Sequence, residues 1–113
     1  MLKDRMLQAV NDQIQAEFES AYIYLAMSAY FEDKGLEGMA NWMHIQFQEE
    51  QTHAMKFYRY IVERGGRVEL KDLPQPPRDW DSPLAAFEAA YDHERMISGR
   101  IDVLVTLAGE LGD

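Results

Sequence analysis

The 113-residue sequence contains no cysteine. Disulfide frameworks, zinc ribbons, iron–sulfur clusters and thiol catalysis are therefore excluded, and a reducing, cytoplasmic location is expected. No run of apolar residues is long enough to span a bilayer. The first ten residues hold Lys3, Asp4 and Arg5 where a signal peptide needs an apolar core, so we expect no export.

Positive charge is also scarce. The chain has 11 Lys and Arg against 20 Asp and Glu, which gives a formal net charge of -9 at pH 7. Nucleic acids and anionic membranes are poor partners for such a surface, whereas cations suit it. With 47% hydrophobic residues, a chain of this length can build its own hydrophobic core, so we expect one domain over residues 1–113.

Proline is absent from the first 73 residues, where helical periodicity is strong. The pattern predicts an all-α chain of three long helices, at about Lys3 to Asp33, about Met39 to Arg64, and Pro83 to about Ala108 or Leu111. Gly35 predicts a left-handed cap, Gly38 allows a tight reversal, and Gly65–Gly66 stops the second helix. Ser82 is the predicted N-cap of the third helix, with Pro83 at its first position.

The connection between the second and third helices is long, and it holds Pro74, Pro76 and Pro77. Neighbouring antiparallel helices in a bundle need only a few residues to join them. Roughly 17 residues of extended chain at about 3.1 Å each cover about 50 Å, against about 40 Å for a helix of roughly 26 residues. The sequence therefore predicts a crossover along the bundle, with the third helix parallel to the second.

Acidic side chains interrupt the apolar stripe of each predicted helix. Spacings of three and four residues define one stripe per helix. The stripes are Leu7, Val10, Ile14, Glu17, Ala21, Tyr24, Ser28 and Phe31; Met39, Met43, Gln46, Glu50, His53, Phe57 and Tyr60; and Leu84, Phe87, Tyr91, Glu94, Ser98, Ile101 and Val105. No Lys or Arg lies on them, although burying an unpaired carboxylate costs several kcal/mol.

The three carboxylates are also predicted at one level of the bundle. Glu50 lies twelve residues after Gly38 and Glu94 lies eleven after Pro83, and these two helices are expected to be parallel. Glu17, on the antiparallel first helix, falls near the same height. A bound cation explains why three carboxylates converge inside the bundle.

Glu50 and His53 form a Glu-x-x-His pair, whose i, i+3 spacing directs both side chains to one point. Mixed carboxylate and imidazole ligands suit non-haem iron or manganese, with zinc as a redox-inert substitute. One such pair and one Glu from each flanking helix make half of a di-iron carboxylate centre. A surface-facing helical pair is the alternative for Glu50 and His53, but it leaves the matching positions of Glu17 and Glu94 unexplained.

Several segments resemble prokaryotic non-haem ferritin, and the resemblance runs from about residue 2 to the last residue. They are Ala16–Phe18, Tyr22–Leu25, Glu32–Gly38, Ala40–Trp42, Gln48–Glu50, His53–Phe57, Glu63–Val68, Ser82–Leu84 and His93–Glu94. The resemblance implies a ferritin-like four-helix bundle that assembles into a hollow shell. It also implies a non-haem di-iron ferroxidase centre, which oxidises ferrous iron with dioxygen before storage as ferric mineral.

The resemblance also assigns roles to individual residues. Glu17, Glu50 and His53 match the ligands of the first iron, with Glu50 bridging, and Glu94 matches a ligand of the second. Tyr24 matches a tyrosine beside the di-iron site, where it forms a hydrogen bond to a metal-ligating side chain or transiently donates one electron. The alternative is a core tyrosine whose hydroxyl is hydrogen-bonded. Glu49 lies near a third iron position of the family, although the sequence alone favours an exposed, solvated Glu.

Other positions distinguish this chain within the ferritin-like proteins. The haem-ligating methionine of bacterioferritins would directly follow the bridging Glu50, and Gln51 stands there, so we expect no haem. His44 and His93 lie off the stripes and read as surface or subunit-contact residues.

The fourth helix of a ferritin subunit is missing from the sequence. Gly109 to Asp113 resemble a helix stop followed by the N-cap of that helix, which in the family carries the remaining ligands of the second iron. We therefore expect a homo-oligomer or another chain that supplies the fourth helix, or that this chain is a fragment of a longer protein. The competing hypothesis is a truncated, non-catalytic metal-binding module with a role in helical assembly.

Overall fold

The computed structural model describes residues 3–112, which fold into three α-helices and no strand. They are α1 (Asp4–Asp33), α2 (Glu37–Glu63) and α3 (Pro83–Leu111). The all-α prediction is confirmed, and each helix begins and ends within a few residues of its predicted bounds. The expected N-cap at Asp113 lies outside the described residues. Within residues 3–112, no helix combines the length and the apolar character needed to cross a membrane.

The predicted helix signals act largely as expected. Gly35 and Gly65 both have φ of 74°, a backbone conformation that other residues rarely adopt. The Ser82 hydroxyl accepts a hydrogen bond from the Ala85 amide and caps α3, with Pro83 in its first turn. Gly38, expected in the reversal, lies instead in the first turn of α2. Residues 34–36 are sufficient for the reversal.

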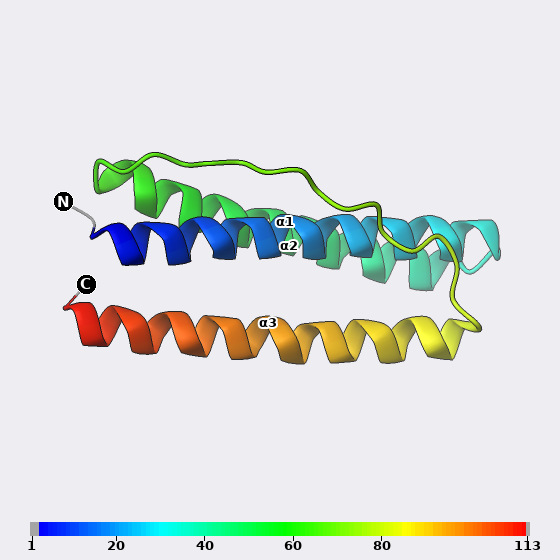
Figure 1. Cartoon of the computed structure of the whole chain (residues 1–113). Helices are drawn as coiled ribbons and strands as arrows, with labels where there is room; N and C mark the ends of the chain where they lie inside the picture. The colour runs from blue at the N-terminus through cyan, green and yellow to red at the C-terminus, as the bar shows by residue number, and fades with distance from the viewer. Residues whose placement is uncertain (1–2, 113) are drawn as a thin grey trace.

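The crossover is also confirmed. Figure 1 shows α1 and α2 antiparallel, and residues 64–82 then run back along the bundle, so that α3 is parallel to α2. The helix α1 packs against both α2 and α3, whereas α2 and α3 meet through side chains, as the Trp42 and Phe87 rings do at 5.5 Å. Each of the two outer helices is therefore positioned by α1.

Side chains of α1 hold the crossover. The Asn11 amide donates to the Arg67 carbonyl at 3.1 Å, and its oxygen accepts from the Glu69 amide at 2.9 Å. Gln15 donates to the Asp72 carbonyl at 2.8 Å. Since the extended segment has no secondary structure of its own, these side chains satisfy backbone groups that a sheet or helix would otherwise pair.

Two apolar clusters lie on either side of the middle of the bundle. The first includes Tyr24, Met27, Phe31, Met43, Ala86 and Ala90, and the second includes Met6, Val10, Ile14, Ile61 and Leu104. Glu17 and Glu50 are buried between them. On α1 the predicted stripe is buried from Val10 to Phe31, so the prediction for this helix is confirmed.

The predicted stripe of α3 is wrong in part. Leu84, Tyr91 and Val105 are 67%, 65% and 66% exposed, and the buried residues of this helix are Ala86, Ala90, Ile97 and Leu104. Small alanines are among the residues that face α1, and the bulkier side chains lie on a second apolar face of the helix. Periodicity alone could not show which of the two faces α1 covers.

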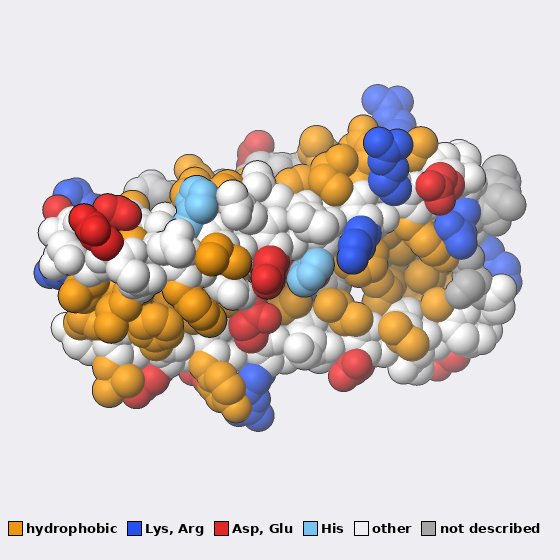
Figure 2. All heavy atoms as spheres, turned by 180° about the vertical axis from the view of Figure 1, so that it is seen from behind, with side chains coloured by type: hydrophobic (Ala, Val, Ile, Leu, Met, Phe, Trp, Pro, Cys, Tyr) orange, Lys and Arg blue, Asp and Glu red, His pale blue; other side chains and the backbone are white. Residues whose placement is uncertain are grey.

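Apolar side chains are also exposed on α2 and α3, where they lie on more than one side of α3. Their exposed large residues include Met39, Trp42, Ile45, Met55, Tyr91, Met96, Val103 and Val105. Figure 2 shows hydrophobic side chains towards both ends of one face, with acidic and histidine side chains between them. A surface of this kind usually marks an interaction site.

Candidate metal centre

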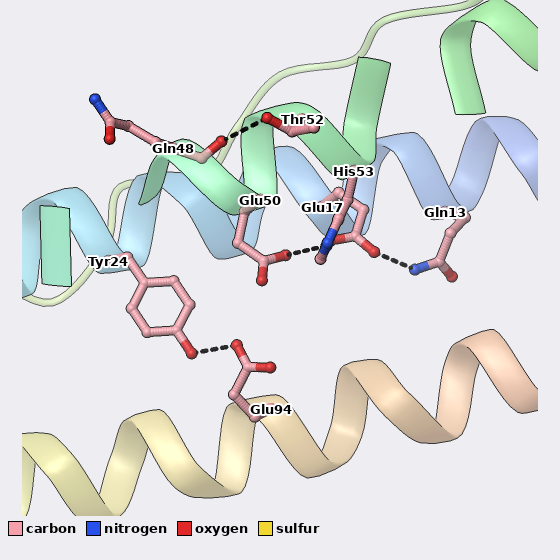
Figure 3. A network of polar contacts seen from close by, with 8 residues as sticks. All are labelled: Gln13, Glu17, Tyr24, Gln48, Glu50, Thr52, His53 and Glu94. Carbon is pink, nitrogen blue, oxygen red and sulfur yellow. Dashed lines mark hydrogen bonds and ion pairs between the residues drawn. The ribbon is translucent and has the colours of Figure 1, made fainter. Parts of the chain in front are cut away.

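Three predicted ligands come together at the middle of the bundle. Glu17, Glu50 and His53 each offer one ligand atom, and these atoms all lie within 4.8 Å of one another. The His53 Nδ1 atom is 3.8 Å from Glu17 Oε2 and 3.8 Å from Glu50 Oε2. Figure 3 shows the three side chains meeting between α1 and α2.

Helix geometry explains the convergence. Glu50 and His53 are one turn apart on α2 and share a face, and the antiparallel packing of α1 brings Glu17 to their level. Glu17 is 0% exposed and Glu50 is 2% exposed, whereas the His53 side chain is 43% exposed. The centre is therefore enclosed on the α1 side and open to solvent beside His53.

The ligand atoms that face one another at the centre lack hydrogen bonds. Glu17 Oε2, Glu50 Oε2 and His53 Nδ1 are buried without a hydrogen-bond partner. Two ligands at about 2.1 Å from one ion are about 3.0 Å apart at right angles and about 4.2 Å apart when opposite. The observed 3.8 Å separations fall between these values. The residues therefore fit one divalent cation with two oxygen ligands and one nitrogen ligand.

The electrostatics of the centre also favour a bound cation. Burial raises the pKa of the Glu50 carboxyl to about 9, and interaction with the Glu17 and Glu94 carboxylates adds to the shift. Without a cation, Glu50 therefore holds a proton at neutral pH. A bound cation would displace this proton, because a metal ligand must be deprotonated.

Glu94 approaches the centre from α3. The Tyr24 hydroxyl donates a hydrogen bond to Glu94 Oε1, and Figure 3 shows the two side chains meeting across from Glu50. Burial, followed by this hydrogen bond, raises the pKa of the Tyr24 phenol well above its ordinary range, so Tyr24 stays protonated. Glu94 is half-buried and lies outside the three-residue group, but close enough for its charge to raise the pKa of Glu50.

The remaining candidates behave differently from one another. Glu49 is exposed and lies outside the ligand group. His44 is exposed, beside Gln48 and the Phe47 ring, as expected. His93, expected as a surface or subunit-contact residue, is half-buried: its ring lies 6.2 Å from the Tyr24 ring at 86°, and its Nε2 atom is buried without a partner in this chain. Burial lowers the pKa of His93.

Sequence reasoning missed Gln13. This residue is 4% exposed, and its amide donates to Glu17 Oε1 at 3.0 Å. Its position four residues before a predicted ligand was the available signal, because side chains at i and i+4 meet on a helix.

A protein-family model described as a ferritin-like domain matches residues 7–113. The chain belongs to the ferritin-like family. The resemblance seen in the sequence is thereby confirmed, as is the ferritin-like fold. The part of the chain that the structure describes holds three helices, so the four-helix bundle implied by the resemblance is not seen whole.

Individual relatives agree with the family. This ferritin-like chain is 42% identical over 108 residues to a bacterial non-heme ferritin of Bacteroides fragilis (strain 638R), covering 96% of the chain and 68% of the relative. It is 37% identical to one from Staphylococcus haemolyticus, covering 96% of the chain and 65% of the relative. The chain thus spans about two thirds of the length of these relatives.

Solved structures show the same likeness. An open pore ferritin from the hyperthermophilic archaeon Archaeoglobus fulgidus superposes with a TM-score of 0.97 and is 50% identical. The match covers 100% of the ferritin-like chain and 70% of the archaeal one. A form of that ferritin engineered to be closed gives a TM-score of 0.96 at the same identity.

Proposed function

We propose that this chain is an iron-storage ferritin subunit that oxidises ferrous iron with dioxygen at Glu17, Glu50, His53 and Glu94. One observation carries the proposal. The buried atoms of Glu17, Glu50 and His53 that lack hydrogen bonds are the same atoms that face one another within ligand distance. The names of the relatives, which are bacterial non-heme ferritins, support iron as the cation.

Each residue has a role in this proposal. Glu17 and His53 hold the first ferrous ion, Glu50 bridges to a second ion, and Glu94 is a ligand of the second. Each ferrous ion loses one electron, and dioxygen accepts the electrons of both. The carboxylates favour the product because hard oxygen ligands stabilise the more highly charged ferric ion.

Tyr24 and Glu49 have secondary roles. The hydrogen bond from Tyr24 fixes one oxygen of Glu94, and its phenol is placed to donate one electron to the site. Glu49, exposed beside the centre, is proposed as a ligand of a third iron position. Haem has no role in the proposal, since Gln51 follows the bridging Glu50.

The proposed setting is a cytoplasmic homo-oligomer. The absence of cysteine fits a reducing compartment. The exposed apolar side chains of α2 and α3 support contact with other subunits. The same side chains are the observation that favours the second candidate function, a metal-binding helical assembly module without catalysis.

Anaerobic titration with ferrous iron, followed by air, tests the chemistry through the growth of ferric absorbance. The unsubstituted chain should oxidise iron much faster than a Glu50→Ala, His53→Ala double variant. Gln51→Ala is the matched control, because this exposed residue lies between the two ligands on α2. Equal rates in the unsubstituted chain and the double variant would contradict ferroxidase activity and favour the assembly module.

A further inference from the structure

Gln13 is a buried amide in the middle of α1, one turn before Glu17. Its Nε2 atom donates to Glu17 Oε1 at 3.0 Å, as Figure 3 shows. A carboxylate accepts hydrogen bonds, so the amide must present its NH2 group rather than its carbonyl oxygen. The contact therefore has one direction, from Gln13 to Glu17.

This hydrogen bond makes the two oxygens of Glu17 different. Oε1 is occupied by Gln13, while Oε2 is buried without a partner and faces His53 Nδ1 at 3.8 Å. The last torsion of a Glu side chain is broad, so an unrestrained carboxylate would rotate and exchange its oxygens. We infer that Gln13 is a positioning residue for cation binding, because it holds Glu17 with one oxygen directed at the ligand group.

A parallel arrangement exists on the other side of the centre. Tyr24, also on α1, occupies one oxygen of Glu94. Both carboxylates therefore meet a neutral donor from α1, and each keeps its other oxygen for a cation. Partners that orient metal ligands in this way typically change metal affinity by about 10–100-fold when they are removed.

The same helix provides a control. Gln15 also donates to a Glu four residues later, since its Nε2 atom is 3.4 Å from Glu19 Oε1. Glu19 does not belong to the ligand group, and the Gln15 contact is only partly buried. Gln13 and Gln15 thus make the same kind of helical contact, and only one of them leads to the centre.

The test compares Gln13→Met and Gln15→Met in the full chain, since Met has a similar length but no donor. Co²⁺ is the probe, with affinity from titration calorimetry and ligand geometry from the visible absorption of bound Co²⁺. We expect Gln13→Met to weaken Co²⁺ binding by about 10–100-fold and to change the spectrum. Gln15→Met should leave both as they are.

Two further measurements keep the result decisive. Gln13→Asn retains an amide, but its side chain is too short to reach Glu17, so this variant should also weaken Co²⁺ binding. Circular dichroism of the helices reports whether each Gln13 variant folds, and the Asn variant replaces the Met variant if the latter does not fold. Unchanged affinity in a folded Gln13 variant would overturn the inference, as would equal losses in the Gln13→Met and Gln15→Met variants or an unsubstituted chain that binds no Co²⁺.

The inference rests on the proposed function only in taking iron as the natural cation. Co²⁺ binding does not require oxidation, so the two ideas fail separately. Loss of Co²⁺ affinity in the Gln13 variants, with no iron oxidation by the unsubstituted chain, would retain the positioning role and remove the ferroxidase activity.

Discussion

The helices α1 and α3 contribute one carboxylate each to the same centre, but they bury these carboxylates differently. Glu17 on α1 is 0% exposed, because α1 packs against α2 and α3 and lies under the crossover. Glu94 on α3 is half-buried, because α3 packs less closely against α1 than α2 does. The comparison indicates that the α1–α2 pair encloses its carboxylates more tightly than α3 does.

The largest expected effect is a loss of stability that compares a buried side chain of α1 with an exposed one of α3. Phe31→Ala removes a fully buried ring of α1 that packs against Phe87 of α3. It should lower the free energy of unfolding by about 3–5 kcal/mol, measured by urea denaturation. Leu84→Ala, at a residue that is 67% exposed on α3, should change it by less than about 0.5 kcal/mol. A similar loss of unfolding free energy in both variants would contradict the difference in burial between these two positions.

The next effect separates the two carboxylates by metal binding. Zn²⁺ at about 100 times its dissociation constant should stabilise the unsubstituted chain by about 2.7 kcal/mol. At the same concentration, Glu17→Ala should retain only about 0.4 kcal/mol if affinity falls about 100-fold. Glu94→Ala should keep most of the stabilisation, as measured by thermal unfolding with and without EDTA. An equal loss in both variants would show that α3 is as important as α1 for the first ion.

A smaller effect concerns the crossover that leads from α2 to α3. Asn11→Ala removes two hydrogen bonds to the crossover backbone and should cost about 1–2 kcal/mol in urea denaturation. Asp12→Ala is the control, because its 3.9 Å pair with Lys71 is exposed and should contribute less than about 1 kcal/mol. A larger loss of unfolding free energy in the Asp12 variant would show that the Asp12–Lys71 ion pair, rather than the Asn11 hydrogen bonds, holds the crossover against α1.

A further effect is a pH dependence of the metal-free chain. The folded-state pKa of Glu50 is raised from 4.5 to about 9, so the stability associated with its protonated form is complete below pH 4.5. It is lost as the pH rises towards 9, because the unfolded chain then ionises more readily than the folded one. The Gln side chain of Glu50→Gln cannot ionise. The free energy of unfolding of this variant, relative to that of the unsubstituted chain, should therefore increase from pH 5 to pH 9. Denaturation curves in EDTA that stay parallel across this range would contradict the shift.

The same asymmetry explains which features the sequence could predict. The stripe of α1 was readable because this helix has one continuous inward face, and Glu17 is its one charged residue. The direction of α3 followed from the length and proline content of residues 67–81. The buried face of α3 did not follow, because this helix carries apolar residues on two faces and only packing against α1 selects Ala86 and Ala90.

The candidate site was predictable to a similar extent. Helical spacing indicated that Glu17, Glu50 and His53 share a level, since that needs only regular geometry. The buried position of Gln13 and the half-buried position of His93 depend on side chains from other turns and other helices. A glutamine beside a stripe is usually exposed in a helix of this length, and only the fold shows that Gln13 lies beneath α3 and against Glu17.

The packing of both outer helices on α1 has a consequence for variation in this chain. The backbones of α2 and α3 each lie against α1, so the separation of Glu50 and Glu94 depends on how closely each helix packs on α1. Substitutions on the outer surfaces of α2 and α3 can therefore accumulate independently of each other. A larger residue at the buried Ala21 of α1 would instead change the separation of Glu50 and Glu94 directly.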